Sequence, residues 1–405
     1  MDKILPFVGV LLAIALFPSW IPQFWNSNRN KAWVMLAFSL PVLLELIPAH
    51  PSLLGHAMGE WVSFICMIGS LFVVSGGISL TGDLRATPKN NLLFLSLGAV
   101  LANFIGTTGA SILLIRPLLK TNSERKNVAH LPIFFIFIVG NCAGLLTPLG
   151  DPPLFMGFLQ GVPFFWTLRL FPIWLLGVSF LLALFFFLDT RAYGRESAWA
   201  LRKDAADVRT LQVQGGVNFL FLTGIMIAVF LPTILREIVM ISMALLSLWL
   251  GSRSARHHNQ FHWHPLVEIA TLFLGIFITM IPALSFLSAH APSFGFTKPW
   301  HFFWGTGLLS GFLDNAPTYL AFLSVAQGSG LAQEVLGVPT RVLEAISVGA
   351  VFMGANTYIG NGPNLMIKSI CDHHGIKTPS FLGYMAYSAA ILLPLYVLIH
   401  FLFFP

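Results

Sequence analysis

Long apolar segments constrain this chain more than any other feature of its sequence, because about 20 apolar residues in a helix cross the hydrocarbon core of a bilayer. Ten stretches are candidate spans, with soft edges: 4–20, 32–48, 60–81, 132–158, 164–188, 215–234, 237–251, 266–288, 342–370 and 380–404. Only 9% of the 405 residues are charged, which is far less than a soluble domain of this size carries. We therefore expect an all-α, polytopic membrane protein.

The charge pattern excludes several other classes of protein. The net charge of +6 comes largely from Lys and Arg in short loops, which set the orientation of a chain in the membrane. Basic residues do not alternate with aromatic ones in any run, so membrane lipid and not nucleic acid is the expected partner. The sequence also lacks the Gly-rich phosphate loop of ATP-driven pumps, and it shows no catalytic set or soluble sensor domain that would suggest an enzyme or a receptor.

Two further apolar stretches, 92–119 and 300–326, are interrupted by small and polar residues. We interpret both as re-entrant hairpins, with tips at Gly106–Ser111 and Asp314–Thr318. Irregular backbone at membrane depth persists only where protein or a water-filled cavity satisfies its polar groups. The tips are therefore expected to lie inside the protein.

The two halves of the chain resemble each other at a nearly constant offset, which indicates an internal repeat. Glu60 aligns with Glu268, the first hairpin tip with the second, and the segment from Thr147 with the segment from Thr357. Each half holds five spans and one hairpin, so the second repeat would enter the membrane from the opposite side. The predicted organisation is repeat 1 at 1–189 (hairpin 92–119, broken helix 132–158), a cytoplasmic linker at 190–214, and repeat 2 at 215–405 (hairpin 300–326, broken helix 342–370).

Two proline-containing motifs interrupt apolar helices at related positions. They are Gly150-Asp151-Pro152-Pro153 and Gly360-Asn361-Gly362-Pro363-Asn364. Proline removes a backbone donor and keeps the preceding residue out of helical geometry. A simple kink is the plain alternative, but two repeat-related breaks, each with polar side chains, favour a cation site.

The hairpin tips supply further oxygen atoms, which hard cations prefer as ligands. Their hydroxyls and amides could instead only cap the hairpin backbone. Asp314 is harder to explain that way, because a carboxylate within the membrane is costly and usually functional. The predicted cation- and proton-binding residues are Asp151, Asp314, Thr107, Thr108, Asn315, Thr318, Thr357, Asn361 and Asn364.

Glu60 and Glu268 each open an apolar span. They could be acids at helix N-termini, which the helix dipole favours. They could equally belong to a proton relay. The sequence leaves these two roles open.

Four motifs in order resemble the ion transporter superfamily over nearly the whole chain, and they look most like NhaD-type sodium/proton antiporters, often labelled citrate-transporter-like. The motifs are Asn103–Ser111, Thr147–Pro153, Asp314–Thr318 and Gly360–Asn364. The resemblance implies a homodimer with a scaffold and a mobile transport domain, an elevator-type motion, and a multi-pass location in a bacterial inner (plasma) membrane. The dicarboxylate branch of the superfamily carries Ser-Asn-Thr at each hairpin tip, and here both tips differ.

The leading hypothesis is therefore sodium/proton antiport, without any cofactor besides the transported ions. Sodium would bind through Asp151, Asp314, Asn315 and Asn361. A proton and a sodium ion can compete for one buried carboxylate, because burial penalises its unpaired charged form. The alternative is sodium- or proton-coupled transport of citrate, a dicarboxylate or another small organic anion.

Overall fold

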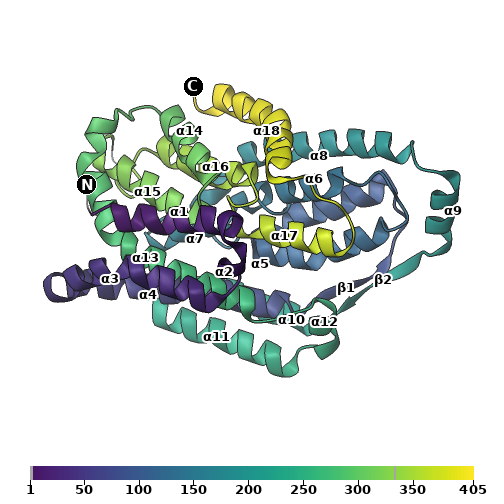
Figure 1. Ribbon diagram of the computed structural model, residues 1–405, viewed down its shortest axis with the longest axis horizontal. Helices are drawn as coiled ribbons and strands as arrows, with labels where there is room; N and C mark the ends of the chain where they lie inside the picture. Colours follow the sequence, from purple (N-terminus) through teal and green to yellow (C-terminus); the bar gives the residue numbers. More distant parts are fainter. Residues whose placement is uncertain (1–2, 333) are drawn as a thin grey trace.

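The computed structural model describes residues 3–332 and 334–405 as a helical bundle with one small β-ribbon (Figure 1). This confirms the all-α, polytopic class. The first half contains α1 (Leu5–Trp20), α2 (Pro22–Trp25), α3 (Asn28–Ala49), α4 (Pro51–Ser75), β1 (Ser79–Asp83), α5 (Pro88–Thr121), α6 (His130–Ile138), η1 (Cys142–Leu145), α7 (Pro152–Leu159), η2 (Phe164–Leu170) and α8 (Phe171–Tyr193). The remainder contains α9 (Ala198–Ala206), β2 (Arg209–Gln214), α10 (Val217–Ala228), α11 (Thr233–Leu250), α12 (Arg253–His258), α13 (His264–His290), η3 (Ala291–Phe294), α14 (Pro299–Ser310), α15 (Asn315–Gly328), α16 (Thr340–Met353), η4 (Gly354–Asn356), α17 (Gly362–His373) and α18 (Phe381–Phe403).

The outer surface of the bundle is apolar, as a surface in contact with lipid must be. In the described part of the chain, seven helical segments are long and apolar enough to span a bilayer: α3, α4, α5, η2 with α8, α11, α13 with η3, and α18. Large apolar side chains project from them, including Trp249 at 80% exposure, Ile234 at 76% and Leu382 at 75%. Burying such surface in hydrocarbon replaces the burial that a soluble protein achieves in its core.

The span expected at 60–81 is wrong at both ends. Its helix, α4, begins at Pro51 and ends at Ser75, and residues 79–83 form strand β1 instead. Proline at the first helical position favours this earlier start, because its missing N–H would have no partner there anyway. The stretch 51–58, which lies between the spans expected at 32–48 and 60–81, is therefore also helix.

Helix α5 folds back on itself as a hairpin. A straight helix of its 34 residues would be about 50 Å long, yet the side chains of Asn91 and Asn122 at its two ends exchange hydrogen bonds of 3.0 and 2.7 Å. The turn is at Gly106, where φ is 76° and ψ is 157°. Glycine alone adopts this region of backbone space without strain. In the second half, α14 packs against α15 across residues 311–314 in a similar way.

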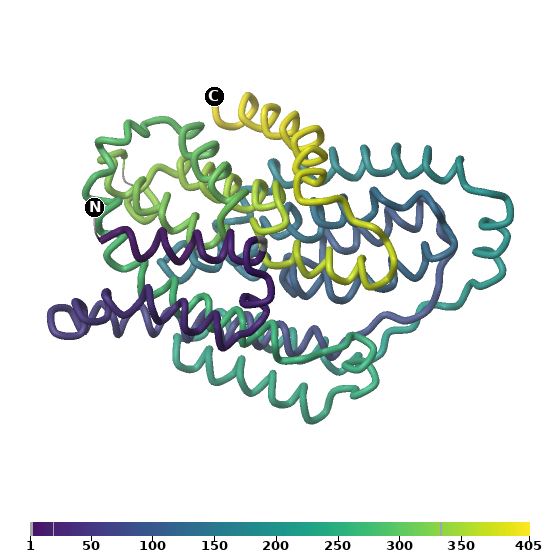
Figure 2. The backbone as a smooth tube through the Cα atoms, in the orientation of Figure 1, coloured from purple at the N-terminus to yellow at the C-terminus, as the bar shows by residue number. Residues whose placement is uncertain are grey.

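The linker at 190–214 is ordered and ties the two halves together. Helix α9 lies at one end of the molecule, and the chain then returns through β2 (Figure 2). Strand β2 pairs antiparallel with β1, with Ser79 opposite Gln214 and Asp83 opposite Arg209. Each strand of this ribbon supplies the hydrogen-bond partners that the other would otherwise lack.

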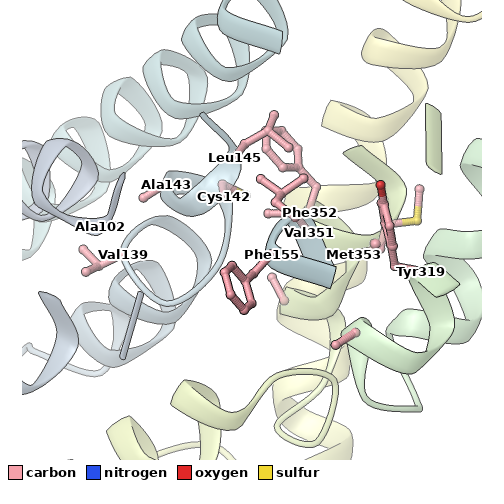
Figure 3. Close-up of a cluster of buried hydrophobic side chains, with 14 of the residues drawn as sticks. Ala102, Val139, Cys142, Ala143, Leu145, Phe155, Tyr319, Val351, Phe352 and Met353 are labelled. Atoms are coloured by element: carbon pink, nitrogen blue, oxygen red, sulfur yellow. The ribbon is translucent and has the colours of Figure 1, made fainter. Parts of the chain in front are cut away.

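The apolar core surrounds the broken helices. Figure 3 shows Phe155 from α7 and Phe352 from α16 near Cys142 of η1, and Tyr319 from α15 further away in the same cluster. All four side chains are buried, at 1% exposure or less. Because these elements come from both halves, the breaks are held between two sets of packed helices.

A buried polar network closes the base of the α5 hairpin. Besides Asn122, Asn91 contacts Asp189 of α8 at 2.9 Å, and Asp189 accepts a hydrogen bond of 2.6 Å from Arg125. His130 lies 2.9 Å from the same carboxylate. A buried charge pair is stable only when its remaining polar atoms also find partners; the network supplies them for the Asp189 carboxylate, whereas Arg125 Nε has no hydrogen-bond partner in the described chain.

Replacing Gly106 with alanine is expected to destabilise the protein by about 1–3 kcal/mol, because alanine is strained in this conformation. The thermal unfolding midpoint of the purified protein in detergent measures the effect. Gly55→Ala in α4 is the matched control, because a Cβ there meets no atom within 4 Å and alanine favours helix. Equal midpoints for the two variants would contradict the assignment of the turn to Gly106.

Candidate functional site

The two proline-containing breaks have the same local geometry. Asp151 precedes α7 with φ −141° and ψ 145°, and Asn361 precedes α17 with φ −152° and ψ 141°. Pro152 keeps Asp151, the residue directly before it, out of helical geometry, and both residues have the extended backbone usual for the position that precedes a helix. Neither side chain caps its own helix, so both are free to act elsewhere.

Asp151 is the centre of the site. Its side chain is buried, and it accepts three side-chain hydrogen bonds from three different elements. Thr107 Oγ1 donates to Oδ1 at 3.0 Å, Asn361 Nδ2 donates to Oδ1 at 3.0 Å, and Asn315 Nδ2 donates to Oδ2 at 2.6 Å. In the described chain, Asp151 forms no ion pair with any Lys, Arg or His. Neutral donors therefore hold this carboxylate.

Four helix starts converge on this carboxylate. Asp151 precedes α7, Asn361 precedes α17, Asn315 is the first residue of α15, and Thr107 begins the second arm of α5 directly after the Gly106 turn. Each helix N-terminus carries about half a positive charge. Together they give the site a positive potential, which lowers the cost of burying one negative charge there.

A second layer of polar groups orients the donors. Asn361 Nδ2 also lies 3.2 Å from both Gly140 O and Asn141 Oδ1. Asn141 Nδ2 donates to Asn364 Oδ1 at 2.7 Å, and Asn364 Nδ2 donates to the carbonyls of Gly354 and Thr357. Sequence reasoning missed Asn141, although its place just before the first break is a signal that could have identified it.

Each hairpin is also tied to the neighbouring break. Thr147 Oγ1 donates to Asn103 O at 2.5 Å, and Asn103 Oδ1 accepts from Leu146 N. In the other half, Thr357 Oγ1 donates to Gly311 O at 2.6 Å. These contacts satisfy carbonyls that the breaks leave without helical partners. Asn103 is a second residue with a structural part that the sequence did not suggest.

The remaining predicted tip residues form no hydrogen bond with Asp151 within the described chain. The Asp314 carboxylate is half-buried and caps α15 by accepting from Ala316 N at 3.1 Å. It therefore has a local capping contact, and its role as a cation ligand stays a prediction. Thr318 donates to the Asp314 carbonyl, which is also a local role. Thr108 is half-buried and makes no side-chain hydrogen bond within the described chain.

Glu60 and Glu268 lie away from this cluster of contacts. Glu60 is inside α4 and not at its start, and it accepts a hydrogen bond of 2.7 Å from Gln160. His56 lies 3.3 Å from the same carboxylate. Glu268 is in the second turn of α13 and pairs with Lys31 at 2.5 Å. Of the two roles left open for Glu60, that of an acid at a helix N-terminus does not fit its place inside α4, and the proton relay stays a prediction.

Within the described residues, no cluster of three or more His, Cys, Asp or Glu side chains could hold a metal ion. A cation at Asp151 would have one carboxylate and otherwise neutral ligands, namely hydroxyl, amide and carbonyl oxygens. Such a set suits a hard, weakly charged ion better than it suits a transition metal.

A buried carboxylate where broken helices meet, inside an apolar multi-span bundle, defines this molecule as a secondary transporter. The chain belongs to the family described as "Putative citrate transport" (CitMHS_2), whose family model matches residues 1–404. No curated protein matches the sequence. The match confirms the citrate-transporter-like resemblance, whereas the NhaD-type subtype stays a prediction. The family's description agrees better with the carboxylate alternative than with sodium/proton antiport.

Replacing Asn361 with alanine is expected to cost about 1–3 kcal/mol of stability, because a buried acceptor then loses a donor. The thermal unfolding midpoint of the purified protein measures this loss. Asn26→Ala is the matched control, since Asn26 is exposed and makes no side-chain hydrogen bond in the described chain. If both variants unfold at the wild-type temperature, Asn361 does not stabilise the Asp151 carboxylate.

Proposed function

We propose that this chain is a secondary transporter of citrate or a related carboxylate, coupled to sodium ions or protons that bind at Asp151. The observation that supports the proposal is the buried Asp151 carboxylate, held by Thr107, Asn315 and Asn361 where four helix starts meet. The family description supports the substrate class.

The chemistry of the donors suits reversible cation binding. An asparagine side chain presents an N–H donor on one side and a carbonyl oxygen on the other. When Asn315 and Asn361 turn their Nδ2 atoms to Asp151, they satisfy its charge. When they rotate by half a turn, the same residues offer Oδ1 atoms to a cation beside the carboxylate. Protonation of Asp151 is the competing way to remove its charge.

The positive ends of the four helices suit an anionic substrate once the charge of Asp151 is neutralised. In broken-helix transporters, half-helix N-termini point at anionic groups of the substrate. The half-buried tip residue Thr108 is a neutral polar group that such a substrate would approach. An unneutralised Asp151 would repel a carboxylate, so cation binding must precede substrate binding, and this order produces coupling.

Sodium/proton antiport is the second candidate. Two acids, Asp151 and Asp314, belong to the same set of helix starts, and in the described chain no Lys or Arg pairs with either of them. A site whose acids form no ion pair with Lys or Arg can exchange one cation for another without binding an anion. On this reading the chain would work as an NhaD-type antiporter.

The resemblance also leads us to propose how the molecule is organised. The inverted repeats at 1–189 and 215–405, the elevator-type motion, the homodimer and a bacterial inner membrane all remain predictions. The shared geometry at Asp151 and Asn361 supports the repeat. The polar ties between each hairpin and its neighbouring break support a transport unit that moves as one body.

Asp151→Asn is expected to reduce sodium- or proton-driven citrate uptake into proteoliposomes at least tenfold, because the amide carries no charge to bind a cation and is itself a donor facing donors. Radiolabelled citrate uptake measures this under an imposed sodium or proton gradient. Glu45→Gln is the matched control, since Glu45 is exposed on α3 and pairs only with Lys3. Normal coupled uptake by Asp151→Asn would refute the assignment.

The same vesicles separate the two candidate functions. Carboxylate transport predicts saturable citrate uptake that requires a cation gradient. Antiport predicts that a sodium jump moves protons when no organic anion is present, and that citrate does not enter. A pH-sensitive dye inside the vesicles reports the second outcome.

A further inference from the structure

A basic cavity lies at the base of the α5 hairpin, remote in sequence from the tip residue Thr107 that contacts Asp151. Its volume is about 840 Å³, which is within the range of small-molecule sites. The second arm of α5, the loop to α6, the β1–β2 ribbon, the end of α12 and the loop after α17 form its walls. The basic-residue pattern places these loops together on the cytoplasmic side.

Positive charge dominates the lining. Six Lys and Arg residues contribute to it, against the single acid Asp83: Arg116, Lys120, Arg125, Lys126, Arg209 and Lys377. Lys120 pairs with Asp83, and Arg125 pairs with Asp189 and lies 3.9 Å from Glu196.

The side chains of the other four cations form no ion pair with a carboxylate within the described chain, although the backbone N–H of Lys126 donates to Glu196. Arg116 contacts only the neutral Gln260, at 3.3 Å, while Lys126, Arg209 and Lys377 form no ion pair there. Like charges lining one cavity repel one another, and this repulsion is relieved when an anion enters. The cavity therefore carries an excess of positive charge that the fold itself does not use.

His258 belongs to the cavity lining and has the positively charged Arg116 as a neighbour. Burial lowers the pKa of its imidazole, and the nearby Arg116 and then His257 lower it further. Burial is the larger cause, and Arg116 and His257 add to it because positive neighbours disfavour the charged form of a histidine.

We propose that this cavity is a second anion site, separate from Asp151, that binds a multivalent anion bearing carboxylate or phosphate groups through Arg116, Lys126, Arg209 and Lys377. A single charge would leave most of these cations unpaired, whereas a multivalent anion contacts several walls at once. Arg116 and Lys126 lie on the hairpin side, and Arg209 lies on the ribbon. A bound anion therefore joins the base of the hairpin to the β1–β2 ribbon.

Isothermal titration tests the site. Citrate and pyrophosphate are added separately to purified Asp151→Asn protein in neutral-lipid nanodiscs. In this variant the central carboxylate makes no contribution. We expect saturable binding, weakened roughly tenfold or more by adding Arg209→Gln and Lys377→Gln, because two charge-assisted contacts are lost. The matched control adds Lys89→Gln and Arg253→Gln, which remove the same two charge types outside the cavity lining.

Equal affinities for the two double variants, or no binding of either probe, would overturn the proposal. Nanodiscs containing phosphatidylglycerol distinguish the sources of the anion. If this lipid abolishes binding of the soluble probes, a lipid phosphate occupies the cavity, and if binding persists, the occupant is a soluble anion. All substituted cavity residues are exposed, so loss of folding does not confound the measurement. Because the central helix starts are the same in both double variants, the difference between their affinities reports the cavity alone and is independent of whether the chain transports citrate.

Discussion

The hydrogen bonds that Thr107, Asn315 and Asn361 donate to Asp151 are the interaction on which the rest of the structure depends. Helices can break deep inside an apolar bundle only if the freed backbone and side-chain groups find partners. Here one carboxylate provides acceptors for three elements, and four helix dipoles offset its charge. The breaks and the buried acid thus stabilise each other, and neither would be tolerated in this interior without the other.

This mutual dependence connects the fold to transport. A site held only by strong ion pairs would resist change, because separating buried opposite charges is costly. Neutral amides and hydroxyls can instead exchange a proton, a cation or a protein donor at Asp151 with little rearrangement. The apolar packing of Phe155 and Phe352 around η1 holds the backbone of the breaks, so under the proposed mechanism only the polar groups would change partners.

The opposite end of the α5 hairpin is stabilised by charged groups instead of neutral ones. There Arg125, Asp189 and the paired Asn91 and Asn122 form a charged, closed network that fixes the hairpin base. At the tip, neutral donors bind Asp151 and can be exchanged for other partners. At the base, the opposite charges of Arg125 and Asp189 hold the hairpin and cannot easily separate. The basic cavity lies against this rigid base, so an anion bound there would meet a preorganised wall, which lowers the entropic cost of binding.

The sequence alone determined much of this protein through its periodicity, its prolines and its polar residues within the membrane. It predicts the helical membrane class, the breaks at Asp151 and Asn361, and the importance of Thr107 and Asn315. All of these follow from the cost of exposing backbone and charge to lipid. Only the tertiary structure decided which oxygens meet. Asp314 caps its own helix, Asn141 joins the site, and Glu60 pairs with Gln160, because such contacts depend on the rotation and depth of helices far apart in the chain. Local sequence sets where a helix breaks, whereas the packing of both halves sets what each break faces.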